Sequence, residues 1–73
     1  MFYKCFLFKF DDEGIKHSAN TALFYDGASL DDVFRSLLPY SRKGWQYADI
    51  YGHNGARWRY CGIFWLEEGC DNV

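Results

Sequence analysis

Apolar residues occupy most of positions 2–10, and two lysines interrupt them. A short run of this kind, rich in phenylalanine, is typical of a strand. The polar stretch 11–14 ends in glycine and predicts a tight turn. Residues 15–25 then predict a second, returning strand, which ends at Asp26-Gly27. Because side chains alternate across a strand, one face of the first strand carries Phe2, Lys4, Phe6, Phe8 and Phe10.

Ser29 begins the only helix that the pattern predicts. It is a favourable N-cap residue, and Asp32 stands where a capping box needs a side-chain acceptor. Pro39 lacks a backbone N–H and is expected to end the helix near Leu38. The apolar positions between them recur at the spacing of one buried stripe: Leu30, Val33, Phe34, Leu37 and Leu38.

Two strand-like runs between residues 45 and 66 flank Asn54-Gly55, the dipeptide best suited to a two-residue type I′ turn. Such a turn pairs His53 with Ala56 and fixes which side chains share a face of the hairpin. One face then carries an aromatic set with Asp49 among it: Trp45, Tyr47, Tyr51, Trp58, Tyr60 and Phe64. The opposite face carries small and aliphatic side chains, two arginines and a tryptophan: Ala48, Ile50, Arg57, Arg59, Cys61, Ile63 and Trp65.

These elements predict an α+β fold of order ββαββ, in which one helix packs on one face of a four-stranded antiparallel sheet. Residues 1–73 form a single domain, and residues 66–73 are expected to be a frayed acidic tail. The helix is expected to pack on the face that carries Ala48 and Ile50, because small and branched side chains allow the helix to approach closely. The aromatic face is then uncovered. Three arrangements would bury it instead: the helix packs on the rings, long loops fold over them, or the first two strands curl around them.

Composition sharpens this expectation, since 49% of the residues are hydrophobic and 22% are aromatic in a chain of 73. Both faces of the sheet need cover, and the only predicted helix can cover one. The net charge of −2 provides no general basic field for nucleic acid or an anionic membrane. Three cysteines are an odd number and indicate a reducing, cytoplasmic setting. The apolar N-terminal run is too short to span a membrane and lacks the features of a signal peptide.

Residues for catalysis or metal binding are sparse, so no cofactor and no metal are expected. Neither His17 nor His53 has a carboxylate or cysteine partner at a ligand spacing. Cys61 falls on the hairpin face opposite His53, which argues against a Cys–His nucleophile. An enzyme is therefore the class that the sequence favours least.

The sequence favours a non-catalytic protein that inhibits or modulates a larger protein assembly through its aromatic face. In size and composition the chain is similar to small proteins that phages encode against host machines such as a nuclease, a defence complex or RNA polymerase. No motif carries this likeness, and it assigns no residue a role. Homodimerisation through the sheet would also account for the rings. The acidic residues expected to form a rim facing basic sites on the partner are Asp11, Asp12, Glu13, Glu67 and Glu68.

Single-stranded nucleic acid is the alternative partner, because small sheets can stack unpaired bases on aromatic rings. The acidic net charge counts against it, since phosphate contacts dominate nucleic-acid affinity. Arg57 and Arg59 also fall on the face opposite the rings. The basic residues that would serve this alternative are Arg42, Lys43, Arg57 and Arg59.

Overall fold

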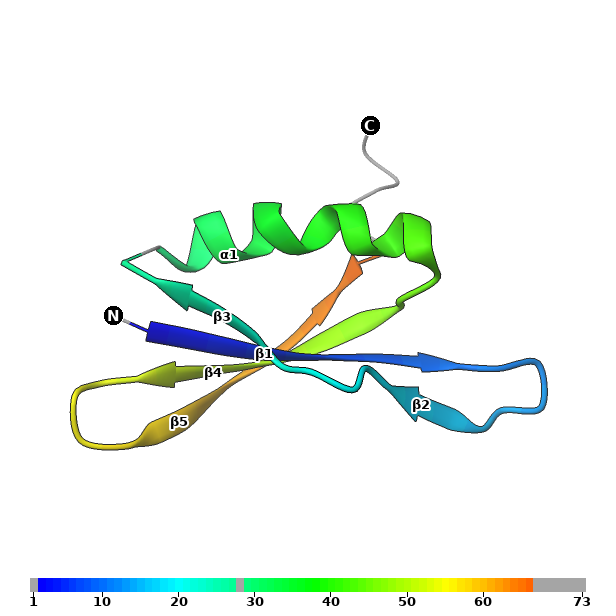
Figure 1. The fold of residues 1–73 in the computed structure, drawn as a ribbon, viewed down its shortest axis with the longest axis horizontal. Helices are drawn as coiled ribbons and strands as arrows, with labels where there is room; N and C mark the ends of the chain where they lie inside the picture. The colour runs from blue at the N-terminus through cyan, green and yellow to red at the C-terminus, as the bar shows by residue number, and fades with distance from the viewer. Residues whose placement is uncertain (1, 28, 67–73) are drawn as a thin grey trace.

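The computed structural model describes residues 2–27 and 29–66. Within these ranges the chain forms a two-layer α+β structure, with a helical layer on one side of an antiparallel sheet (Figure 1). The elements in chain order are β1 (Phe2–Phe10), β2 (Lys16–Ser18), β3 (Leu23–Asp26), α1 (Leu30–Leu37), the 3₁₀ helix η1 (Leu38–Lys43), β4 (Tyr47–His53) and β5 (Trp58–Trp65).

The sheet has five strands rather than the predicted four, because the second predicted strand is broken. Its first part, β2, pairs with the end of β1, and its second part, β3, pairs with the start of β1. Between them Ala19 N–H still donates to Leu7 O at 3.0 Å, so one interrupted segment follows a single edge of β1. On the other side of β1 lie β4 and then β5. The predicted class, with one helix on one face of an antiparallel sheet, is confirmed.

The helix begins as predicted. Ser29 Oγ accepts a hydrogen bond from Asp32 N–H, and the Asp32 carboxylate accepts one from Ser29 N–H, so the capping box is complete. The α-helical part ends at Leu37, close to the predicted end. The chain then continues through Pro39 as η1, which ends at Lys43 and is capped by Gly44 with a φ of 95°.

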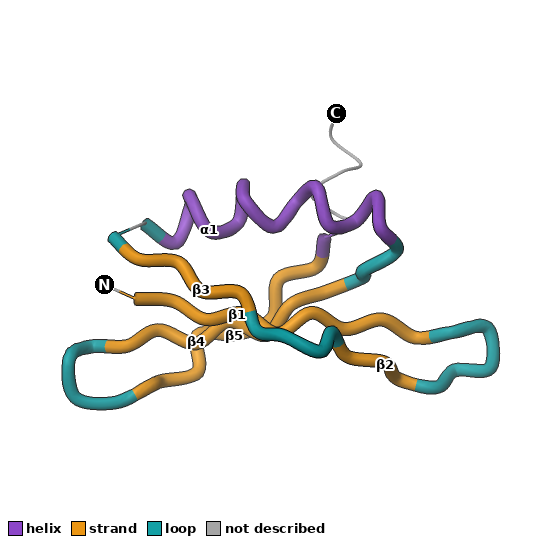
Figure 2. Tube along the Cα trace, viewed as in Figure 1, coloured by secondary structure: helices purple, strands orange, loops and turns teal. Residues whose placement is uncertain are grey.

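The core lies between α1 and one face of the sheet. Figure 2 shows the helical layer on this side, and no element of residues 2–27 or 29–66 lies over the opposite face. Val33 and Leu37 of α1 are fully buried against residues of β1 and β4 and against Leu66, which follows β5. The buried cluster consists of Tyr3, Cys5, Leu7, Val33, Leu37, Ala48, Ile50 and Leu66.

Leu66 corrects one boundary of the predicted frayed tail. It is fully buried, and its N–H donates to Gln46 O at 2.9 Å. Residues 67–73 of that predicted tail lie outside the described residues. The same Gln46 also links to β1, since its N–H donates to Phe8 O and its side-chain oxygen accepts from Phe10 N–H. Gln46 therefore connects the start of β4 to both neighbouring strands.

The predicted turn at Asn54-Gly55 is wrong in length. Gly55 has a positive φ of 99°, but Asn54 does not, and a type I′ turn needs positive φ at both residues. The connection is instead a four-residue loop, in which Asn54 Oδ1 accepts from Ala56 N–H and Arg57 N–H. The first strand pair is therefore between His53 and Trp58.

A bulge changes the register again midway along β5. Tyr51 pairs with Tyr60 and Ile50 pairs with Gly62, so Cys61 is an extra residue in β5. A Cβ added to Gly52 would lie 3.3 Å from Cys61 Sγ, so this thiol lies beside β4. One extra residue exchanges the two faces for the rest of the strand.

The predicted faces are consequently wrong for the second half of β5. Phe64 pairs with Ala48 on the helix side, where its ring stacks on Phe34 at 4.4 Å and 12°. Ile63 and Trp65 pair with residues of the opposite, uncovered face. Trp45 is also misplaced by the prediction: it precedes β4 and packs against the buried cluster under the helix.

This register makes opposite predictions for two adjacent aromatic residues. Phe64→Ala removes a ring from the helix–sheet interface and should lower the free energy of unfolding by about 2–4 kcal/mol. Trp65→Ala removes a ring that is 45% exposed and should cost about 1 kcal/mol, the size of its contact with Tyr47. Denaturant unfolding of the two variants measures both values. A larger loss in Trp65→Ala than in Phe64→Ala would contradict the register.

Candidate interaction surface

The sheet face away from α1, called here the open sheet face, is lined mainly by aromatic side chains. The strand registers place on it alternate residues of each strand. Its members are Phe2, Lys4, Phe6, Phe8 and Phe10 of β1, Lys16 and Ser18 of β2, Phe24 and Asp26 of β3, Tyr47, Asp49, Tyr51 and His53 of β4, and Trp58, Tyr60, Ile63 and Trp65 of β5.

Tyr47 is the centre of a ring cluster on this face. Its ring lies 5.2 Å from Phe8, 6.3 Å from Phe10 and 4.9 Å from Trp65. Only 6% of Tyr47 is exposed, although the helix lies on the other side of the sheet. Neighbouring side chains of the open sheet face therefore bury it.

Tyr51 is the centre of a second ring cluster, nearer the β4–β5 loop. Its ring meets Phe6 edge-on at 5.7 Å and lies 5.3 Å from Tyr60. Beside it, His53 and Trp58 pair across the strands with ring centroids 4.9 Å apart. Together the two clusters form an aromatic surface that runs along β4 and spans β1, β4 and β5.

Large parts of these rings face solvent. Tyr60 is 55% exposed and Trp58 is 36% exposed. Together with the exposed rings of Phe2, Phe10, Phe24 and Trp65, the uncovered aromatic area is on the order of 500 Å², which is near the upper end for a soluble monomer. Trp58 and Tyr60 are exposed as predicted, whereas Tyr47 is buried.

Two lysine side chains lie across this aromatic surface. Lys4 Nζ lies 4.4 Å from the centroid of Trp58, and Lys16 Nζ lies 4.3 Å from that of Phe8. Both distances fit cation–π contacts, in which the aliphatic stem covers apolar surface as well. The sequence analysis did not assign these lysines a role, although the alternation along β1 places Lys4 among the rings.

Asp49 lies among the rings and is linked to Tyr60. The Tyr60 hydroxyl donates to Asp49 Oδ1 at 3.2 Å. Desolvation raises the pKa of Tyr60, and the neighbouring Asp49 carboxylate raises it further. The hydroxyl therefore keeps its proton at neutral pH, and this contact holds the Tyr60 ring across β4.

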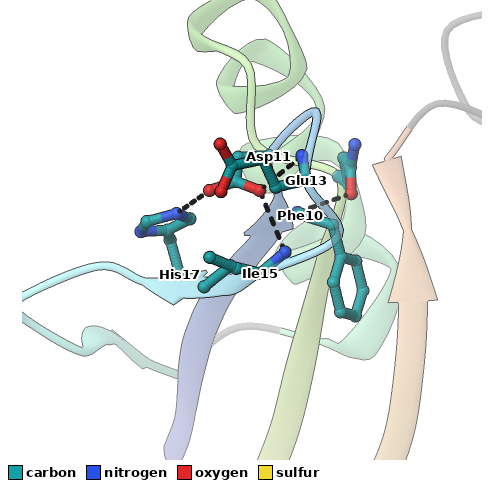
Figure 3. A network of polar contacts seen from close by, with 6 residues as sticks. Phe10, Asp11, Glu13, Ile15 and His17 are labelled. Carbon is teal, nitrogen blue, oxygen red and sulfur yellow. Dashed lines mark hydrogen bonds and ion pairs between the residues drawn. The ribbon is translucent and has the colours of Figure 1, made fainter.

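The predicted acidic rim is only partly available to a partner. Figure 3 shows Asp11 at the β1–β2 turn, where its Oδ1 accepts from Glu13 N–H and Ile15 N–H, both at 2.9 Å. Its Oδ2 lies 2.8 Å from His17 Nε2. His17 thus has a carboxylate partner within the turn, which the sequence analysis did not identify. Asp12 and Glu13 are exposed, whereas Glu67 and Glu68 lie outside the described residues.

The four basic residues assigned to a nucleic-acid site do not lie on the open sheet face. Arg42 and Lys43 belong to η1, and Lys43 Nζ lies 5.2 Å from the Tyr40 ring. Arg57 lies in the β4–β5 loop, and Arg59 pairs with Gly52 on the helix side of the sheet. They form no continuous basic track beside the rings.

The helix side offers little reactive chemistry. Burial raises the pKa of the Cys5 thiol to about 11, so Cys5 is protonated at neutral pH. A cavity of about 40 Å³ lies between α1 and the bulge in β5, lined by Leu30, Phe34, Ile50, Cys61, Gly62 and Ile63. Residues 2–27 and 29–66 contain no group of three potential metal ligands. None of their helices is long and apolar enough to cross a membrane.

Comparison with protein-family models, curated proteins and solved structures finds no match to this chain.

The turn network predicts a specific change in the pKa of Asp11. The hydrogen bond from His17 is the largest cause of the lowered pKa of this carboxyl, followed by the amide bond from Ile15. In His17→Ala the pKa should rise but stay below its ordinary value, because the amide bonds remain. Carboxyl carbon NMR titration measures it, with His53→Ala as the control.

The same shift fixes the direction of the pH effect on stability. A carboxyl with a lowered pKa in the folded state stabilises the fold above its unfolded-state pKa, and this contribution is lost as the pH falls through the folded-state value. As the pH falls into the acid range, the free energy of unfolding should therefore decrease less steeply in His17→Ala than in the wild type. An Asp11 pKa equal in His17→Ala and His53→Ala would contradict the assignment.

Proposed function

We propose that this chain is a non-catalytic protein-binding module that inhibits or modulates a larger protein assembly through its open sheet face. The observation that carries the proposal is the exposed aromatic surface around Trp58, Tyr60 and Trp65 on the side of the sheet away from the helix. Rigid tyrosine and tryptophan rings bury much area for little lost side-chain entropy, and they are enriched among the residues that dominate binding energy.

The arrangement of this surface also suits binding to a protein. The rings are held in place by contacts with each other, so little ordering is needed when a partner covers them. Exposed acidic groups, Asp12 and Glu13, lie at one tip of the β1–β2 hairpin, where they would affect association rate and selectivity more than affinity. A regulator of a nuclease, a defence complex or RNA polymerase, as phages encode, is the setting that we propose for it.

Single-stranded nucleic acid is the second candidate, and one observation favours it. Lys4 and Lys16 lie on the same face as the rings, whereas the four basic residues first considered do not. A stacking surface with adjacent cations is what proteins use to bind unpaired strands.

Replacement of two exposed rings tests the proposal. Trp58→Ala/Tyr60→Ala should reduce retention of a partner from bacterial lysate by at least about tenfold, because each truncated anchor typically costs more than 1 kcal/mol. The double variant should still unfold cooperatively. Quantitative mass spectrometry of proteins retained from nuclease-treated and untreated lysate measures the effect, since nuclease treatment removes partners held through nucleic acid.

Arg35→Ala/Arg59→Ala is the matched control, because both side chains are exposed and belong to the helical layer or its side of the sheet. It should retain the partner as the wild type does. Equal retention by the ring variant and the wild type would contradict the proposal. Retention that disappears with nuclease treatment would favour nucleic acid instead. If the ring variant unfolds, Phe24→Ala replaces it, since Phe24 is 68% exposed.

A further inference from the structure

The two lysines of the open sheet face stand at opposite ends of its aromatic surface. Lys4 reaches towards Trp58 beside the β4–β5 loop, and Lys16 reaches towards Phe8 near the β1–β2 turn. Lys4 Nζ also lies 5.8 Å from the Phe6 ring centroid and 5.7 Å from that of Tyr51, and Lys16 Nζ lies 5.8 Å from that of Tyr47. Tyr51 and Tyr47 are four positions apart in β4, so the two ammonium groups are separated by about 13 Å along the sheet.

Neither lysine is neutralised by a carboxylate within residues 2–27 and 29–66. The ion pair recorded there is between His17 and Asp11, away from both ammonium groups. Asp49 and Asp26 lie on the same face: Asp49 accepts the Tyr60 hydroxyl, and Asp26 pairs with Phe2 at the outer edge of the sheet. The open sheet face therefore presents two cations, each held over rings, and between them lie aromatic rings and Asp49, whose carboxylate accepts the Tyr60 hydroxyl.

We propose that the open sheet face binds an extended acidic segment of a partner protein, with carboxylates pairing to Lys4 and Lys16 and apolar side chains covering the rings between them. This inference rests on the proposed protein-binding function and adds the chemistry of the partner. A separation of about 13 Å corresponds to acidic residues about four positions apart in an extended segment. Charge-assisted pairs at both ends would fix the position and direction of the segment.

The lysine geometry favours such a segment over nucleic acid. The ammonium groups already occupy positions over Trp58 and Phe8, so a stacked base would have to displace them. A carboxylate can pair with each ammonium from the side without breaking the cation–π contact. The net charge of −2 and the positions of the remaining basic residues off this face give a phosphate backbone no track to follow.

Selection from a random-peptide library on the immobilised full-length protein tests the inference. Peptides selected by the wild type should be enriched in Asp and Glu about four positions apart, with apolar residues between them. Lys4→Glu/Lys16→Glu should abolish this acidic enrichment and bind the selected peptides at least about tenfold more weakly. Fluorescence anisotropy of labelled selected peptides measures the affinities.

Lys9→Glu/Lys43→Glu is the matched control. These two lysines also lie over rings, at 4.8 Å from Trp45 and 5.2 Å from Tyr40, but not on the open sheet face. The control makes the same change in net charge and should leave selection and affinity unchanged. Equal weakening in both double variants would show a general charge effect and overturn the inference. If Lys4→Glu/Lys16→Glu does not fold, Lys4→Gln/Lys16→Gln takes its place.

The remaining outcomes separate this inference from the proposed function. Selected peptides without acidic enrichment whose binding needs Trp58 would overturn the inference and leave the function standing. Failure to select any peptide that depends on Trp58 would count against both. Labelled oligothymidylate that binds the wild type, with salt-sensitive affinity lost in Lys4→Glu/Lys16→Glu, would overturn the acidic segment in favour of nucleic acid. Self-association lost in the same variant would assign the face to a second copy.

Discussion

Among the described residues, one eight-residue α-helix has to cover a sheet whose two faces are both apolar. Its buried stripe, with Val33 and Leu37 at the centre, is wide enough for one face only. The helix packs on the face that carries Ala48 and Ile50, and the broader rings remain on the other side. The open sheet face is therefore uncovered because α1 can cover only the opposite face of the sheet. Both proposals on binding depend on this uncovered face.

The sequence predicts the parts of this fold that local patterns determine. Ser29 and Asp32 predict the helix start, and the spacing of Leu30, Val33 and Leu37 predicts its buried side. The faces of β1 and β4 follow from simple alternation. The faces of β5 do not, because they depend on the length of one loop and on one extra residue at Cys61. The alternation of residue types along β5 does not reveal this extra residue. The sequence analysis therefore placed Phe64 and Trp65 on the wrong faces of the sheet.

Side-chain contacts between residues far apart in the sequence could not be predicted from the sequence either. Lys4 and Lys16 lie on different strands, and only the register of β2 against β1 shows that both reach the same aromatic surface. The pairing of Asp11 with His17 depends on the shape of the turn between them. The open sheet face therefore has cations among its rings. Asp11 of the predicted acidic rim holds the β1–β2 turn.

The most direct test of the account is the exposure of individual aromatic rings to a soluble paramagnetic gadolinium chelate, measured by NMR on the full chain over a range of protein concentrations. The account predicts strong relaxation enhancement for ring protons of Tyr60 and Trp65 and weak enhancement for those of Phe64, which stacks on Phe34 under the helix. Protection of Tyr60 and Trp65 at the lowest concentration would mean that the chain covers this face itself and would contradict the open sheet face.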